Sequence, residues 1–162
     1  MSANSSSISF RPAVPDDIPG ILELLEEYVR QQLVLPRTAE ELQNNYRNFI
    51  VAVNDDDGKI VGAVALRPFE GGYFEVRSLA VASEYSGSGL GSKLVAAVLK
   101  RAETLRPIAK CVFALTKRPN LFHRLGFRDA PHEAFPGKIW ADCLQCPKYH
   151  CCDEDAVEYH LD

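Results

Sequence analysis

A strand, a glycine-rich loop and a helix follow one another between residues 74 and 103, and this order constrains the fold most. Phe74–Val81 alternates in polarity as a strand does, and Ser86-Gly-Ser-Gly-Leu-Gly91 contains three glycines. A glycine backbone can approach a ligand that a Cβ would keep away, and a helix N-terminus attracts anions. The segment therefore predicts a pyrophosphate site, with a linker or an ordinary helix-start turn as the alternative.

The apolar patterns on either side of the loop have different periods. The strand is expected to direct Glu75, Arg77 and Leu79 to one face and Phe74, Val76 and Ser78 to the other. The helix carries apolar residues at helical spacing: Leu90, Leu94, Val95, Val98, Leu99 and Ala102. We therefore expect this helix to pack on the sheet through one face.

Charge is unevenly distributed along the 162 residues, although the net charge is only −4. Residues 77–128 contain ten Lys or Arg and two acidic residues, whereas the remainder contains eight basic and twenty acidic ones. A basic surface around the glycine loop would attract an anionic cofactor. The acidic overall balance argues against nucleic acid, and no apolar run is long enough to span a membrane. Residues 1–7 resemble no secretory signal, so we expect a disordered tail there and a cytoplasmic location.

The elements alternate in a way that predicts the α/β class, with an α+β mixed sheet in a single domain. Strands are expected over residues 7–12, 49–53, 59–68, 72–82, 110–115 and 157–161, and helices over 16–32, 92–103 and 119–125. Asp16 can cap the first helix, and Thr38-Ala-Glu-Glu41 is a capping box that starts another short helix. The strand–helix–strand order around 74–115 implies a parallel pair, and the hairpins before it imply antiparallel strands.

Two motifs resemble those of the GNAT acetyltransferases. Ser86–Gly91 is similar to their acyl-CoA loop, Gln/Arg-x-x-Gly-x-Gly/Ala, with Gly89 and Gly91 in place and Ser86 where a long side chain is usual. Phe122–Phe127 resembles their ending (Tyr/Phe)-x-x-x-Gly-Phe. The resemblance implies an N-acetyltransferase domain over residues 8–162 that uses acetyl-CoA. It also implies a mostly antiparallel sheet, flanked by helices, whose parallel central pair splays at the cofactor site.

The same resemblance implies which residues hold the cofactor. It places a bulge in the central strand near Leu79 and Ala80, which exposes backbone groups to the pantetheine arm. The cofactor-binding residues it implies, through their backbone, are Leu79, Ala80, Val81, Ser86, Gly87, Ser88, Gly89, Leu90, Gly91 and Ser92.

Acetyl transfer needs a base for the acceptor amine, and Glu75 is the candidate. It lies just before the cofactor loop and resembles the glutamate of this strand in many GNAT enzymes, although a simple ion pair with Arg77 is the alternative. The family's acid tyrosine aligns with Phe122, which cannot donate a proton. Thr116 or a water could assist the leaving thiolate, or no acid is used; an ordinary strand-end hydroxyl is the alternative for Thr116.

Further segments resemble the acetyltransferase domain of N-acetylglutamate synthases. Leu35–Leu42 is similar to their Val-Arg-Arg-Ser-x-x-x-Leu stretch, and 61–69, 75–81 and 113–118 also look like that family. The tail over 140–154 resembles the short, stand-alone bacterial members. The resemblance implies acetylation of L-glutamate, the first step of arginine synthesis, and we expect no amino-acid-kinase-like domain and carry over no arginine feedback.

A dicarboxylate substrate favours arginine, whose guanidinium binds carboxylates in a bidentate way. Arg37 matches the family arginine that grips a substrate carboxylate, with a surface arginine at a helix start as the alternative. Arg77, Arg118 and Lys138 are candidates for the second carboxylate, and each could be a bystander. Among partners we expect a small amino acid, neither nucleic acid nor membrane, and leave a homodimer open.

Four of the five cysteines cluster near the end of the chain, at 143, 146, 151 and 152, while Cys111 lies in an apolar strand and is expected in the core. The cluster fits a metal knuckle, a redox-labile pair or reduced cysteines beside the substrate. We assign no metal ligand. A GNAT enzyme for another small amine or a protein N-terminus, and a non-catalytic acyl-CoA-binding module, remain alternative functions.

Overall fold

The central strand β4 (Tyr73–Val81) lies between an antiparallel neighbour, β3 (Ile60–Pro68), and a parallel one, β5 (Cys111–Thr116). The computed structural model describes residues 7–32, 36–131 and 155–161. The other strands are β1 (Ile8–Pro12), β2 (Phe49–Asn54), β6 (Arg128–Ala130) and β7 (Asp155–His160). The strand order is β1-β2-β3-β4-β5-β7-β6, and all pairs except β4–β5 are antiparallel. This mixed sheet confirms the predicted fold class.

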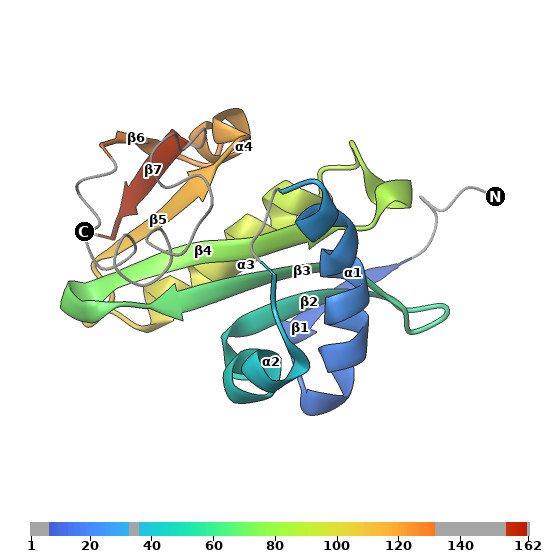
Figure 1. Ribbon diagram of the computed structural model, residues 1–162. Coiled ribbons are helices and arrows are strands. Elements are labelled where there is room, and N and C mark those ends of the chain that lie inside the picture. Colours follow the sequence, from blue (N-terminus) through green and yellow to red (C-terminus); the bar gives the residue numbers. More distant parts are fainter. Residues whose placement is uncertain (1–6, 33–35, 132–154, 162) are drawn as a thin grey trace.

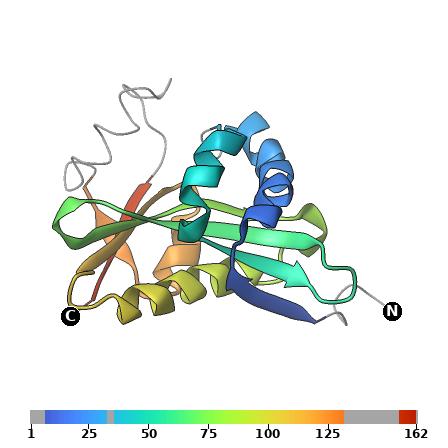
Figure 2. The same ribbon diagram turned by 90° about the horizontal axis from the view of Figure 1, so that it is seen from below.

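Helices cover both faces of the sheet (Figures 1 and 2). On one face, α1 (Ile18–Arg30) and α2 (Ala39–Asn45) share an apolar cluster with β2 and β3. On the other face, α3 (Leu90–Thr104) packs against β2, β3 and β4, and α4 (Pro119–His123) packs against β7 and α3. The sheet is therefore buried on both sides around β3 and β4, which positions the glycine loop at one end of β4.

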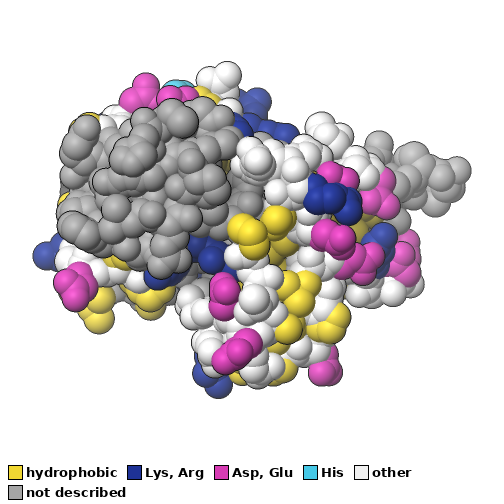
Figure 3. Space-filling view, in the orientation of Figure 1, with side chains coloured by type: hydrophobic (Ala, Val, Ile, Leu, Met, Phe, Trp, Pro, Cys, Tyr) yellow, Lys and Arg dark blue, Asp and Glu magenta, His cyan; other side chains and the backbone are white. Residues whose placement is uncertain are grey.

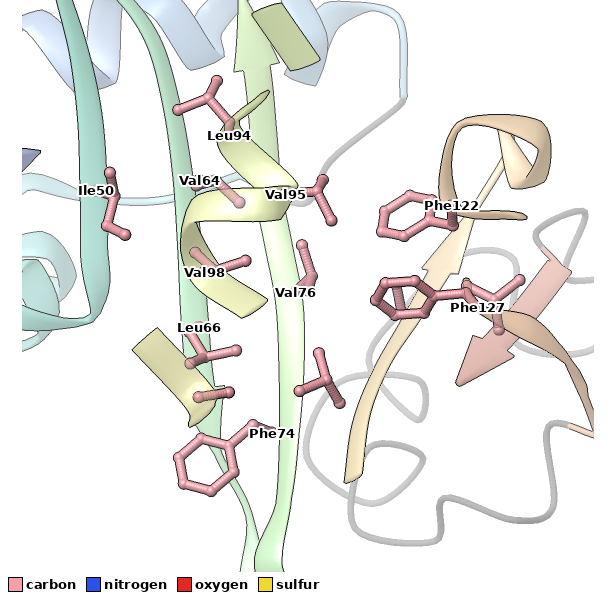
Figure 4. Packing of buried hydrophobic residues seen from close by; sticks show 14 of the residues in the cluster. Ile50, Val64, Leu66, Phe74, Val76, Leu94, Val95, Val98, Phe122 and Phe127 are labelled. Carbon is pink, nitrogen blue, oxygen red and sulfur yellow. The ribbon is translucent and has the colours of Figure 1, made fainter. Parts of the chain in front are cut away.

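The periodicity of α3 is confirmed by its burial. The expected residues Leu90, Leu94, Val95, Val98 and Ala102 are buried, and Leu99 packs partly buried against the same cluster. Figure 4 shows Leu94, Val95 and Val98 facing Val64, Leu66 and Val76 of the sheet. Phe122 and Phe127 join this cluster edge-to-face, with ring centroids 5.1 Å apart. Phe122 thus takes a core position.

A β-bulge changes the faces of β4. Ala63 of β3 pairs with Ala80 and Ala65 pairs with Arg77, so β4 has one more residue than β3 between these pairs. Ser78 lies at the bulge and adopts the left-handed backbone conformation, with a φ of 56°. Past the bulge, Leu79 packs in the α3-side cluster with Phe74 and Val76. The expected alternation is therefore wrong from Ser78 onwards, because strict period-two alternation cannot include a bulge.

The β4–β5 pair splays after a short paired stretch. Only Tyr73, Phe74 and Glu75 of β4 pair with Cys111–Phe113 of β5, whereas β5 continues to Thr116 alongside β7. The expected splay is confirmed, and Glu75 is the last paired residue before β4 and β5 separate.

The start of α1 differs from the prediction. Residues Pro15–Asp17 form a 3₁₀ turn, α1 begins at Ile18, and Asp17 rather than Asp16 anchors the junction. The Asp17 carboxylate receives two hydrogen bonds from the Arg11 guanidinium, at 2.7 and 2.9 Å, and one from the Val14 N–H at 2.8 Å. In contrast, the Thr38 cap is confirmed, since Thr38 Oγ1 accepts a hydrogen bond from the Glu41 N–H at 3.1 Å. The short strand β6 was not predicted, because three residues carry too little periodicity.

We expect Asp17→Asn to lower the free energy of unfolding by about 1–3 kcal/mol at neutral pH, because it weakens a bidentate pair around a buried carboxylate. Arg11 lowers the pKa of Asp17. The stabilisation is therefore complete above the unfolded-state pKa and is lost as the pH falls through the folded-state value. Urea unfolding at pH 7 and at acidic pH checks this, and a difference between wild type and variant that grows on acidification would contradict it.

Candidate active site

Two cavities open beside β4, one on each side of the bulge. The larger cavity, of about 1100 Å³, lies between α1, the end of β4, the glycine loop and the start of α4. The smaller cavity, of about 490 Å³, lies between α2 and the middle of β3 and β4. We call them the loop cavity and the arginine cavity.

The glycine loop presents backbone N–H groups to the loop cavity. Gly87 and Gly89 adopt φ values of 78° and 85°, which favour glycine, and α3 begins at Leu90. The N–H groups of Ser86 and Ser88 donate to carbonyls earlier in the turn, at 3.1 Å each. Those of Gly87 and Gly89 donate to no other described residue. Alternating N–H groups at a helix start form an anion-binding concavity.

Basic side chains line part of the same cavity, whose lining also includes Glu23, Glu27 and Glu84. Lys59, Lys117, Arg118 and Arg124 line it, from the β2–β3 turn and from the start and end of α4. Gly91 contributes differently from the other glycines: a Cβ there would lie 3.3 Å from Leu121 Cδ1, so its small size serves the packing of α3 on α4. The cavity therefore combines N–H donors and positive charge, as a polyphosphate requires.

Tyr28 of α1 forms hydrogen bonds to the backbone of β4 at the edge of the loop cavity. The Val81 N–H donates to Tyr28 Oη at 3.0 Å, and the Tyr28 hydroxyl donates to the Val81 carbonyl at 3.1 Å. Sequence reasoning expected these Val81 groups at the cofactor and did not single out Tyr28. Its place on α1, three residues after buried Leu25, was the available signal.

Three arginines converge on the arginine cavity. Arg37, Arg67 and Arg77 line it together with Ser78 of the bulge. The side chains of Arg37 and Arg77 are 17% and 9% exposed. Glu41 lies 3.6 Å from the Arg37 guanidinium, and the Arg67 guanidinium lies 4.7 Å from the centre of the Phe69 ring. Lys and Arg side chains are visible on this face of the sheet, above α2, in Figure 3.

Arg67 is a site residue that sequence reasoning missed. It pairs in register with Glu75 across the β3–β4 ladder, so both side chains share the face of Arg77. The register could not be read from the sequence, although an arginine ending the apolar run of β3 was a signal. The structure thus brings Arg37 and Arg77 together as expected and adds Arg67.

Glu75 lies at the point where β4 and β5 separate, two residues before Arg77, and is not among the residues that line either of the two cavities. Its side chain is buried, with the residue 2% exposed, and the Arg77 guanidinium lies 3.5 Å from its Oε1. The ion pair considered from the sequence is therefore present. A carboxylate can take a proton from an amine directly or through one water. The contact with Arg77 connects Glu75 to the arginine cavity.

The remaining predicted residues lie elsewhere. Arg118 lines the loop cavity and not the arginine cavity, because β5 diverges from β4 before reaching it. Thr116 Oγ1 accepts a hydrogen bond from the Arg118 N–H at 2.8 Å and lines neither of the two cavities. Its hydroxyl thus accepts a hydrogen bond at the end of β5, and its role as an acid stays a prediction. Lys138 and the cysteines of 140–154 lie outside the described residues.

The sequence profile of the acetyltransferase (GNAT) domain matches residues 45–129, which include both cavities' strands, the glycine loop and α3. The chain belongs to the GNAT acetyltransferase family. This GNAT chain is 35% identical to an uncharacterized N-acetyltransferase of Chlorobaculum tepidum, over 87% of its own length and 88% of that protein's. It is 33% identical to the amino-acid acetyltransferase of Mannheimia succiniciproducens, over 81% of its own length and 29% of that protein's.

The fold has a close match among solved structures. N-acetylglutamate synthase of Neisseria gonorrhoeae, solved with coenzyme A and N-acetyl-glutamate, superposes with a TM-score of 0.83 at 26% identity, over 97% of this chain and 36% of that one. The GNAT chain thus spans about a third of the N-acetylglutamate synthase and of the amino-acid acetyltransferase that it resembles. None of its described helices is both long and apolar enough to cross a membrane. The family makes the protein an acyltransferase.

Proposed function

We propose that the protein transfers an acetyl group from acetyl-CoA to the α-amine of a small amino acid with a second carboxylate, and that L-glutamate is this acceptor. The observation that carries the proposal is the group of three arginines, Arg37, Arg67 and Arg77, around a cavity next to Glu75. The likeness to amino-acid acetyltransferases and to N-acetylglutamate synthase supports it. The product would then be N-acetylglutamate, which opens arginine synthesis.

The cofactor would lie in the loop cavity. Its pyrophosphate would accept hydrogen bonds from the N–H groups of Gly87 and Gly89 and from the first turn of α3, with Arg118 and Arg124 supplying positive charge. The pantetheine arm would follow Leu79–Val81 towards the splay between β4 and β5. The Tyr28 hydroxyl would then either keep its hydrogen bonds to the Val81 backbone beside the pantetheine arm or lose them to it.

The acceptor would lie in the arginine cavity with its amine directed towards Glu75. Arg37 and Arg67 lie on the α2 and β3 sides of this cavity, where they could each bind one carboxylate. Arg77 would remain paired with Glu75, since the two groups lie 3.5 Å apart. Lys138 remains a candidate for the same substrate.

The reaction would proceed by direct transfer. Glu75 takes a proton from the ammonium group, the amine nitrogen attacks the thioester carbonyl, and backbone N–H donors of β4 stabilise the oxyanion. The carbon–sulfur bond then breaks, CoA leaves as a thiolate, and the new amide nitrogen loses its surplus proton to solvent, from which the thiolate can be protonated. A thiol of pKa about 8.5 is a good leaving group, so the step does not depend on an acid at Thr116.

An acetyl-CoA-dependent thiol-release assay against the free amino acids tests the acceptor. We expect glutamate to give the highest kcat/KM and to exceed glutamine at least tenfold, because the neutral amide cannot form an ionic pair with an arginine fork. Equal values for the two would reject the dicarboxylate pocket. Activity confined to another amine would identify a different acceptor, and tight CoA binding without turnover a non-catalytic module.

A glycine substitution tests the cofactor site. Gly89→Val should weaken acetyl-CoA binding by at least about tenfold, because a β-branched residue at φ 85° displaces the N–H groups that face the cavity. Gly58→Val is a matched control: Gly58 has φ 72° and equally open surroundings but lines neither of the two cavities. Calorimetry measures both, and an unchanged affinity for Gly89→Val would remove the loop from the site.

A further inference from the structure

Three potential metal ligands meet on β5 and β7, outside both cavities. Cys111, Glu158 and His160 each offer one donor atom, and these three atoms lie within 4.8 Å of one another. Cys111 pairs directly with His160 across the antiparallel β5–β7 ladder, and Glu158 lies two residues before His160 on the same face of β7. The register therefore creates the cluster, although Cys111 and Glu158 lie 47 positions apart in the sequence.

We propose that Cys111, Glu158 and His160 form a binding site for a Zn²⁺ ion. Sulfur, imidazole and carboxylate are the donors that zinc uses, and three protein ligands leave a fourth tetrahedral position for water. With bonds of about 2.0–2.3 Å, donor atoms around tetrahedral zinc lie roughly 3.3–3.7 Å apart. His160 Nε2 and Glu158 Oε1 are already 3.3 Å apart, so mainly the thiol side must close in.

Arg128 of β6 orients the carboxylate of this cluster. Its Nε lies 3.7 Å from Glu158 Oε2, while Glu158 Oε1 faces His160. One carboxylate oxygen can therefore bind the ion while the other keeps its contact with the guanidinium, an arrangement typical of supported metal ligands. The Arg128 charge and the buried thiol oppose binding: Cys111 is 4% exposed and burial raises its pKa to about 11, so the ion must displace a tightly held proton.

An ion at this site would join the last described strand to the strand beside the catalytic one. Glu158 pairs with Phe113, and Phe113 pairs on its other side with Glu75. Zinc would thus fix β7 to β5 on the same sheet face as Glu75, two strands away from it. The proposal concerns strand fixation and does not depend on which amine the enzyme acetylates.

The other four cysteines must be removed for a decisive test. In the 162-residue chain with Cys143, Cys146, Cys151 and Cys152 replaced by Ser, Cys111 is the single remaining cysteine. Titration with Co²⁺, a spectroscopic substitute for Zn²⁺, should then give a thiolate-to-cobalt charge-transfer band that saturates at one ion per chain. Zn²⁺ should abolish the band by displacement and raise the melting temperature by several degrees.

Single substitutions in this background assign the ligands. His160 is 43% exposed, so His160→Asn should fold normally and weaken Co²⁺ binding at least about tenfold. His123→Asn is the matched control, because His123 also contacts a carboxylate, that of Asp129 at 2.7 Å, but does not belong to the three-ligand cluster. The His123→Asn variant should keep the Co²⁺ affinity of the background protein. Glu158→Gln should weaken binding, and Cys111→Ser should remove the band. Absence of the band in the background protein, or equal Co²⁺ affinity for His160→Asn and His123→Asn, would overturn the proposal.

Discussion

Glu75→Gln should lower turnover by about 10²–10⁴-fold while leaving the affinity for acetyl-CoA unchanged. In the proposed mechanism the carboxylate takes the ammonium proton, which a neutral amide cannot do, whereas the N–H groups proposed to bind the cofactor lie on the loop after Ser86. The loss should shrink as the pH rises, because the acceptor amine then loses its proton without help. Steady-state rates between neutral and alkaline pH, with calorimetry for acetyl-CoA, measure both effects.

A buried ion pair also breaks in this variant, so a control must separate structure from chemistry. Asp17→Asn removes another buried carboxylate that pairs with an arginine, but it lies at the start of α1, and Asp17 lines neither of the two cavities. We expect that control to lose stability and keep turnover once folded. A Glu75→Gln loss that persists at every pH, or a loss of equal size in Asp17→Asn, would point to structural damage instead of a missing base.

Local patterns predicted what lies close in sequence. The glycine loop, the apolar face of α3 and the Thr38 cap depend on contacts within a few residues, so spacing alone indicated them. The parallel β4–β5 pair followed from the strand–helix–strand order. These features were sufficient to locate the loop cavity.

Register decided what the sequence could not. The bulge at Ser78 moves Leu79 to the α3 face, and the β3–β4 ladder places Arg67 beside Glu75. The divergence of β5 carries Arg118 to the loop cavity, away from Arg37. In each case the pairing register, or the direction in which a strand diverges, determines which side chains meet. Neither property produces a periodic pattern in the sequence.

Arg37→Ala should raise the KM for glutamate by about 10–100-fold and leave the KM for acetyl-CoA unchanged. A charge-assisted hydrogen bond to a carboxylate contributes roughly 1.5–3 kcal/mol. Arg37 lines the arginine cavity and not the loop cavity. Arg67→Ala should behave in the same way, because Arg67 enters that cavity from β3. Initial rates with each substrate varied in turn measure these constants.

The chain offers a close control and a graded variant for this prediction. Arg47, exposed just after α2 with its guanidinium 5.2 Å from the Tyr46 ring centre, is not among the residues that line either of the two cavities, so Arg47→Ala should keep both constants. Arg37→Lys keeps the charge and loses the bidentate fork, so its KM for glutamate should fall between wild type and Arg37→Ala. If the arginines bind the two carboxylates, Arg37→Ala and Arg67→Ala should also lower the preference for glutamate over glutamine unequally, because only one of them faces the side-chain carboxylate. The variant with the greater loss of preference then identifies that arginine. If neither variant changes the preference for glutamate over glutamine, another group binds the side-chain carboxylate. The arginine cavity would then not have the role proposed for it.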